Sequence, residues 1–154
     1  MSEPSLLTAP GDEPGFRAAY EQAVKSFEER GVPVGAALSL DGEVIAAGHN
    51  ERVQKGDPIA HGEMSCIRNA GRRRDYDRMT LYTTLSPCPM CSGTILLFGI
   101  GRVVVGEATN FSGDLDFLRS HGVEVVLLDD PACIELMARF QRELPEVWLE
   151  DIGR

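Results

Sequence analysis

A histidine, a carboxylate and two thiols stand at short intervals in this sequence, and such side chains bind metals and move protons. His61 and Glu63 are separated by one glycine in AHGEMSC, and Cys88 and Cys91 by two residues in SPCPMCSG. An imidazole and two thiolates are donors that zinc prefers. Either fragment alone is common in proteins without a metal. The elements that carry the fragments therefore decide whether the four side chains can share one site.

The apolar pattern predicts an α/β domain. A two-residue turn at Asp41-Gly42 separates two runs typical of strands and predicts a hairpin. Strands are expected over residues 34–40, 43–48, 79–84, 102–106 and 123–128, and helices over 16–27, 61–70, 86–98, 114–122, 132–144 and within 145–154. The alternation after the hairpin predicts a three-layer α/β/α sandwich. Its mixed five-stranded sheet should be largely parallel with one antiparallel edge strand.

Both fragments fall where a strand passes into a helix. Cysteines three apart share one helix face, and a helix N-terminus favours the thiolate over the thiol. Ser86 is expected as the N-cap of that helix, with Pro87 as its first residue. Residues two apart in a regular helix diverge, so His61 and Glu63 can face one site only if His61 holds an irregular first position. Gly62 would let a ligand approach the backbone closely.

The four side chains together indicate a catalytic zinc site. His61, Cys88 and Cys91 supply three ligands and leave the fourth zinc position open for water, as in catalytic rather than structural sites. Glu63 would then be the general acid and base beside the metal, not a ligand. The combined pattern H-x-E…P-C-x-x-C is the known signature of zinc-dependent nucleobase deaminases.

Length and charge are consistent with a small cytoplasmic enzyme. The 154 residues suit one domain, expected over residues 15–154 after a flexible segment at 1–14. A net charge of −9 argues against nucleic acid as a partner, and the basic run 72–74 is interpreted as a solvated loop. No targeting signal and no apolar run long enough for a membrane span is seen. The cysteines Cys66 and Cys133 are expected in the core.

The sequence resembles the yeast-type cytosine deaminases of the cytidine deaminase-like zinc superfamily. The resemblance runs from about Gly31 to Gly153 and is carried by four stretches: GHNERVQKGDPIAHGEMSCIRNAG, TLYTTLSPCPMCSGTILLFGI, VVVGEATNFSG and PEVWLEDIG. It implies a cytidine deaminase-like fold, a homodimer with one Zn²⁺ per subunit, and hydrolysis of cytosine to uracil and ammonia in pyrimidine salvage.

The resemblance also implies substrate contacts. Asn50 and the Gly62 N–H would bind the 2-oxo edge of the base. The Ser86 carbonyl and Asp151 would hold the exocyclic amine. Phe111 and Trp148 would form the apolar walls and lid. A small, planar, neutral base needs such a site of aromatic walls and a few fixed polar groups.

Other activities stay open. Val53 stands where this family carries a bulky aromatic, so isocytosine, a 5-substituted cytosine or another amino-heterocycle is an alternative substrate. A small guanine deaminase is the nearest rival, whereas the acidic charge disfavours an RNA-editing adenosine deaminase. A non-catalytic zinc module and a thiol redox protein are alternatives of a different class.

Overall fold

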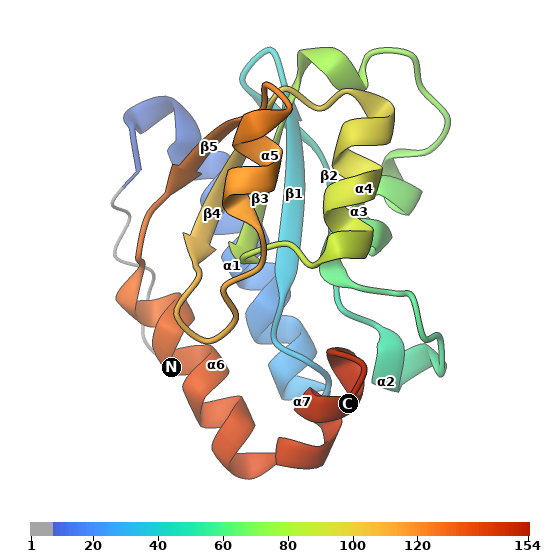
Figure 1. The fold of residues 1–154 in the computed structure, drawn as a ribbon, viewed down its shortest axis with the longest axis vertical. Coiled ribbons are helices and arrows are strands. Elements are labelled where there is room, and N and C mark those ends of the chain that lie inside the picture. Colours follow the sequence, from blue (N-terminus) through green and yellow to red (C-terminus); the bar gives the residue numbers. More distant parts are fainter. Residues whose placement is uncertain (1–7) are drawn as a thin grey trace.

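The computed structural model describes residues 8–154, and this part of the chain forms five strands and seven α-helices (Figure 1). The strands are β1 (Gly35–Leu40), β2 (Glu43–His49), β3 (Met79–Leu85), β4 (Arg102–Glu107) and β5 (Glu124–Leu127). The helices are α1 (Glu13–Glu28), α2 (Arg52–Lys55), α3 (Gly62–Ala70), α4 (Pro89–Phe98), α5 (Leu115–Ser120), α6 (Pro131–Glu143) and α7 (Pro145–Asp151). Short 3-10 turns cover Pro10–Asp12 and Tyr76–Arg78.

The strands form one mixed sheet in the order β2-β1-β3-β4-β5. β1 pairs antiparallel with both β2 and β3, whereas β3, β4 and β5 are parallel. The predicted five-stranded mixed sheet is confirmed, but the antiparallel strand was expected at an edge, and that was wrong. β1 lies inside the sheet because the hairpin places β2 outermost and leaves the other side of β1 free to pair with β3.

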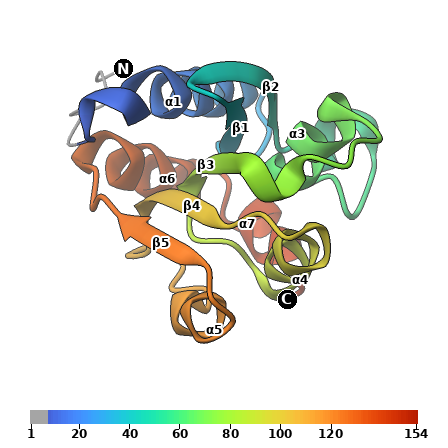
Figure 2. The same cartoon turned by 90° about the horizontal axis from the view of Figure 1, so that it is seen from above.

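Helices cover both faces of the sheet, which confirms the three-layer sandwich. Figure 2 shows α1 and α6 on one face and α3, α4 and α5 on the other. Alternate residues of one strand serve the two layers, since side chains of a strand point to opposite faces. On β4, Val103 and Val105 pack with the α3, α4 and α5 side, whereas Val104 packs with the α1 and α6 side.

The parallel pairing of β3 with β4 positions the site. The carboxyl ends of both strands lie side by side, where Leu85 pairs with Glu107. The chain leaves β3 there to enter α4, and leaves β4 to enter the loop before α5. Residues that follow these two strands therefore lie close together.

The predicted flexible segment at residues 1–14 is only partly described. Residues 1–7 lie outside the described part, whereas Pro10–Asp12 form a 3-10 turn and Asp12 is buried. The Asp12 carboxylate accepts hydrogen bonds from the Tyr82 hydroxyl at 2.8 Å and from both terminal nitrogens of Arg102 at 2.7 and 2.8 Å. These bonds tie the chain before α1 to the middle of the sheet.

Candidate active site

His61 and Cys88 each occupy the N-cap position just before a helix. His61 precedes α3 with ψ 161°, and Cys88 precedes α4 with ψ 172°, so both have extended backbone. Cys91 lies in the first turn of α4, and its backbone N–H donates to the Cys88 sulfur at 3.5 Å. The two N-cap side chains therefore project from helix ends, and the irregular position expected for His61 is present.

The three potential ligand atoms fit a tetrahedral zinc site. The His61 Nδ1 lies 3.4 Å from the Cys88 sulfur and 3.7 Å from the Cys91 sulfur, and all three atoms lie within 4.8 Å of one another. Zinc–nitrogen and zinc–sulfur bonds of ordinary length meeting at a tetrahedral angle place N and S about 3.6 Å apart. The donor set and its spacing thus suit Zn²⁺.

The two thiols have opposite pKa shifts. A hydrogen bond from the Cys91 thiol, helped by the His61 imidazole, lowers the pKa of Cys88 to about 4. The same contact and burial raise the pKa of Cys91 well above its usual value. Burial opposes the charge on His61, but its contact with Cys88 and the nearby Asp151 and Glu63 carboxylates raise its pKa to about 9. These shifts favour negative charge on Cys88 over Cys91, and a thiolate is the form that metals bind.

Glu63 lies beside this cluster and is almost wholly shielded from solvent. Its residue is 3% exposed, and burial raises the pKa of its carboxyl to about 7, although His61 acts in the opposite direction. A carboxyl group with such a pKa can both take and give a proton near neutral pH. Its environment suits the predicted general acid and base.

The glycine between His61 and Glu63 is required by the backbone of a neighbouring segment. A Cβ at Gly62 would lie 2.8 Å from the Val34 carbonyl oxygen. That same oxygen accepts a hydrogen bond from the Asn50 N–H at 2.9 Å. The glycine is explained by the close packing of α3 on Val34, the residue before β1. This reason adds to the ligand approach expected for Gly62.

A small inner cavity of about 20 Å³ lies against Glu63 and His61. Phe111 and Trp148 form part of its wall, with ring centroids 6.1 Å apart and planes at 85°. Ser86, the residue after β3, also lines this cavity. This volume holds about one water molecule, so side chains of the wall must move to admit a six-membered ring.

An outer cavity of about 310 Å³ adjoins the inner one and shares part of its lining. The residues that line both cavities are His61, Cys88, Phe111, Asp151 and Ile152. Arg52 and Met90 line the outer cavity alone. The outer cavity therefore reaches two of the candidate metal ligands.

Asp151 is held by residues from the opposite end of the chain. Its Oδ1 accepts a hydrogen bond from the Asn50 Nδ2 at 2.8 Å and lies 3.6 Å from the His61 Nε2. Arg52 lies 3.8 Å from Asp151 and 3.4 Å from Glu150, and its Nε donates to the Pro58 carbonyl. Burial raises the pKa of Asp151. Figure 1 shows α2 and α7 at the same end of the molecule, as these ion pairs require.

The structure brings most of the predicted residues to one place. The inner cavity is lined by His61, Glu63, Ser86, Cys88, Phe111, Trp148 and Asp151, each of them predicted. Asn50, Gly62 and Cys91 do not line it. Asn50 reaches the site through Asp151, Gly62 packs against Val34, and Cys91 belongs to the cluster with His61 and Cys88. Sequence reasoning missed the lining residues Val34, Leu85 and Ile152 and the ion-pairing Arg52. Ile152 and Leu85 adjoin predicted residues, whereas Val34 and Arg52 carry no comparable signal.

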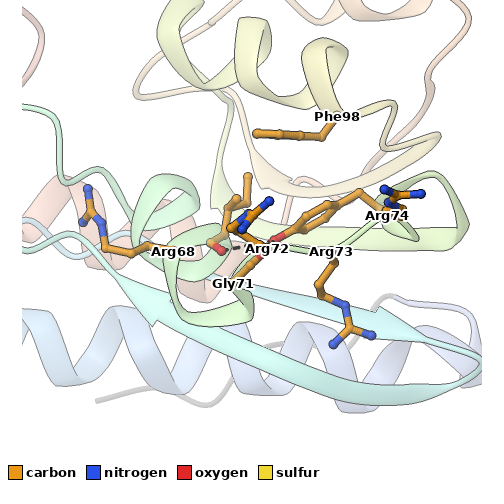
Figure 3. Close-up of a pocket in the computed structure, with 8 residues that line it drawn as sticks. Arg68, Gly71, Arg72, Arg73, Arg74 and Phe98 are labelled. Carbon is orange, nitrogen blue, oxygen red and sulfur yellow. Dashed lines mark hydrogen bonds between the residues drawn. The ribbon is translucent and has the colours of Figure 1, made fainter.

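A larger hollow of about 630 Å³ lies elsewhere, between the end of α3 and the end of α4 (Figure 3). Figure 3 shows Arg72 and Arg74 turned toward the space beneath Phe98, while Arg73 points the other way, where it forms two bonds to Asp75. None of the predicted site residues lines this hollow. The chemistry therefore belongs to the smaller cavity at His61. The exposed positions of residues 72–74 agree with a solvated loop.

Known proteins share this sequence pattern and fold. A family model described as the cytidine and deoxycytidylate deaminase zinc-binding region matches residues 11–107. The chain is 52% identical to a cytosine deaminase of Candida albicans, over 92% of this chain and 97% of that protein. It is 42% identical to a tRNA-specific adenosine deaminase of Bacillus subtilis, over 86% of this chain and 90% of that protein. A guanine deaminase structure from Nitrosomonas europaea superposes with a TM-score of 0.73 at 22% identity, covering 92% of this chain and 89% of that one. That last likeness concerns the fold alone.

Proposed function

The chain belongs to the zinc-dependent cytidine and deoxycytidylate deaminase family, and we propose that it hydrolyses cytosine to uracil and ammonia. The observation that carries this function is the buried Glu63 beside a His61, Cys88 and Cys91 donor set. The similarity to the Candida albicans cytosine deaminase over nearly the whole chain supports cytosine as the substrate. His61 Nδ1 and the two sulfurs would hold the zinc ion.

Each step of the reaction needs a proton at a defined place. Bound zinc would supply hydroxide near neutral pH by lowering the pKa of a water molecule. The Glu63 carboxylate takes the proton of that water and delivers it to N3 of the base as oxygen adds to C4. Glu63 would then take the proton of the hydroxyl group now on C4 and give it to the exocyclic amine, so that the C4–N bond breaks, ammonia leaves and the 4-oxo group of uracil forms. A pKa of about 7 for Glu63 suits both halves of this cycle.

The remaining contacts orient the base. Asp151 and the Ser86 carbonyl would accept hydrogen bonds from the exocyclic amine, and Asn50 and the Gly62 N–H would bind the 2-oxo edge. Phe111 and Trp148 would cover the faces of the ring. The similarity to a cytosine deaminase over nearly the whole chain supports a free base over a nucleoside.

Three rival classes of substrate receive less support than cytosine. Val53, the reason to expect a relaxed preference, does not line the inner cavity and is 44% exposed on α2. Guanine remains a rival because a guanine deaminase shares the fold. A tRNA substrate is disfavoured by the net charge of −9, although tRNA-specific adenosine deaminases are among the relatives.

The test is ammonia release by purified, zinc-loaded protein from cytosine, isocytosine, guanine and cytidine, measured side by side. We expect cytosine to give the highest kcat/KM. A higher kcat/KM for guanine would contradict the proposal. Stoichiometric zinc without ammonia from any base would instead favour a non-catalytic zinc module, and reversible Cys88–Cys91 oxidation without metal would favour a redox protein.

Assembly and location complete the proposal. We expect a homodimer with one zinc ion per subunit, acting in pyrimidine salvage in the cytoplasm. The exposed apolar residues Leu97 and Phe98 on α4, 77% and 43% exposed, support burial of this helix against a second copy. Sedimentation velocity would measure the mass. Within residues 8–154, no helix combines the length and apolar character needed to cross a membrane.

A further inference from the structure

The loop between β4 and α5 carries Phe111 into the wall of the inner cavity. Phe111 lies on no helix or strand, so regular secondary structure does not fix it. It nevertheless packs edge-on against Trp148 and lines both the inner and the outer cavity. The bonds of its immediate neighbours must therefore set its position.

Glu107, the last residue of β4, binds the start of this loop. Its side chain is fully buried, and its Oε2 accepts hydrogen bonds from the backbone N–H groups of Thr109 and Asn110 at 2.8 and 2.9 Å. Its Oε1 accepts from the Asn110 Nδ2 at 2.9 Å. Three N–H donors around an acceptor-only group match an ionised carboxylate, whose burial without partners would be costly.

Asn110 in turn binds the loop to α6. Its Nδ2 also donates to the Ile134 carbonyl at 3.0 Å, and its Oδ1 accepts from the Gln141 Nε2 at 2.8 Å. Turning the Asn110 amide over would place a donor against Gln141 and an acceptor against Glu107. The direction of every bond in this network is therefore fixed.

The other flank of Phe111 is bound to β3. The Ser86 hydroxyl donates to the Ser112 carbonyl at 2.9 Å, and the Ser86 N–H donates to the Glu107 carbonyl at 2.9 Å. Glu107 therefore contacts both the loop, through its carboxylate, and Ser86 in the cavity wall, through its backbone. Phe111 lies between two residues, Asn110 and Ser112, that are each held by hydrogen bonds.

We propose that Glu107 is a positioning residue that holds Phe111 against Trp148, through Thr109 and Asn110, and so sets the width of the base-binding cavity. This role rests on the proposed function for its effect on cytosine. Glu107 does not line either cavity and touches no substrate. Its removal should loosen binding of a single-ring base more than it slows the chemistry at Glu63.

The test is Glu107→Gln, which keeps the size of the side chain but gives it one NH2 group. That NH2 must face either the two backbone N–H groups or the Asn110 Nδ2, so a donor meets a donor in either rotamer. We expect KM for cytosine to rise about tenfold while kcat stays within about threefold, with zinc content unchanged. Trp148, the only tryptophan of the chain, should become more accessible to acrylamide quenching. The matched control is Glu43→Gln, the same change at an exposed position of β2, which should alter none of these.

A second substitution separates positioning from loss of stability. In Glu107→Gln/Asn110→Asp the glutamine NH2 again faces an acceptor, but the new carboxylate oxygen faces the Ile134 carbonyl about 3.0 Å away, so KM and quenching should return only part of the way to wild type. If Glu107→Gln does not fold, Gln141→Leu removes the donor to Asn110 from a half-buried position on α6 and should raise KM and quenching in the same direction.

The proposal would be overturned if a folded Glu107→Gln protein had unchanged KM and unchanged Trp148 quenching. It would also be overturned if Glu107→Gln and the double variant lost kcat equally. Failure of the wild-type protein to release ammonia from cytosine would refute the proposed function instead. The quenching measurement needs no substrate, so it still decides whether Glu107 positions Phe111.

Discussion

The Asn50 amide donates to the Asp151 carboxylate at 2.8 Å, although 101 positions separate the two residues in the chain. The bond joins the end of the first hairpin to the last helix. The same carboxylate oxygen lies 3.6 Å from the imidazole of His61. The group expected to bind the amine of the base is thus held by Asn50 on one side and lies beside His61 on the other.

Asp151→Asn tests whether the charge at this position matters for the substrate. An amide oxygen can still accept from Asn50, but its NH2 group would face the amine of the base. We expect kcat/KM for cytosine to fall at least about tenfold. Steady-state ammonia release measures it. Glu150→Gln is the control, because the neighbouring carboxylate is 68% exposed, and equal effects of the two changes would contradict a specific role for Asp151.

Glu63→Gln tests the proton transfers. The amide keeps the shape of the side chain but can neither take nor give a proton, so turnover should fall by about 10²–10⁴-fold. Zinc content, measured by atomic emission, should be unchanged because Glu63 is not a ligand. The exposed Glu28→Gln on α1 is the control. Turnover within twofold of wild type in a zinc-loaded Glu63→Gln protein would refute its role.

Cys88→Ala tests whether Cys88 is a metal ligand, with the core cysteine Cys66 as the comparison. Loss of one of three ligands should lower zinc affinity by at least about an order of magnitude, and activity should fall with it. Cys66→Ala is the matched control, since Cys66 is fully buried in the core cluster and burial raises the pKa of its thiol to about 12. Removing that sulfur should cost stability but leave zinc in place. Similar zinc loss in both variants would contradict the assignment.

Asp12→Asn tests the attachment of the N-terminal turn to the sheet. The hydrogen bonds from Arg102 lower the pKa of Asp12, so its charged form stabilises the folded state. We expect the free energy of unfolding at pH 7 to fall by about 1–3 kcal/mol. Urea unfolding measures it. Asp41→Asn, which breaks an exposed ion pair with Arg78, should cost less than about 1 kcal/mol.

The difference in unfolding free energy between wild type and Asp12→Asn should depend on pH with a definite sign. A carboxyl group whose folded-state pKa is lowered stabilises the protein fully above its unfolded pKa of about 3.9. The difference between wild type and Asp12→Asn should therefore be constant from pH 7 to pH 5. It should shrink as the pH falls below about 4 toward the lowered folded-state pKa. A difference that grows on acidification would contradict the assignment.

Turn and helix-capping patterns in the sequence predicted most helices and strands. Where the start of α4 was misplaced, a second local effect, that of proline on the preceding residue, was responsible. The turn at Asp41-Gly42 has positive φ at both residues, 52° and 83°, as a tight hairpin requires. The helix expected from Ser86 instead begins at Pro89. Two prolines explain this, because the residue before a proline avoids the helical conformation. Cys88, before Pro89, is therefore extended and becomes the N-cap.

Pairing between distant segments could not be read from local patterns. Nothing in the hairpin itself indicates that β1, not β2, pairs with β3, since the choice depends on how the hairpin docks on α3. The metal-binding residues were predictable because a compact motif carries them. Arg52 and Glu107 were not, because their partners, on α7 and in the loop before α5, become neighbours only in the folded chain.

The order of the site residues along the chain has a consequence during synthesis. All three candidate metal ligands belong to the first 91 residues, whereas Trp148 and Asp151 belong to the final helix. The nitrogen and sulfur donors are therefore all translated about sixty residues before Asp151, a lead of several seconds at about 5–20 residues per second. An ion can enter before the cover exists, and no later opening is needed to load it.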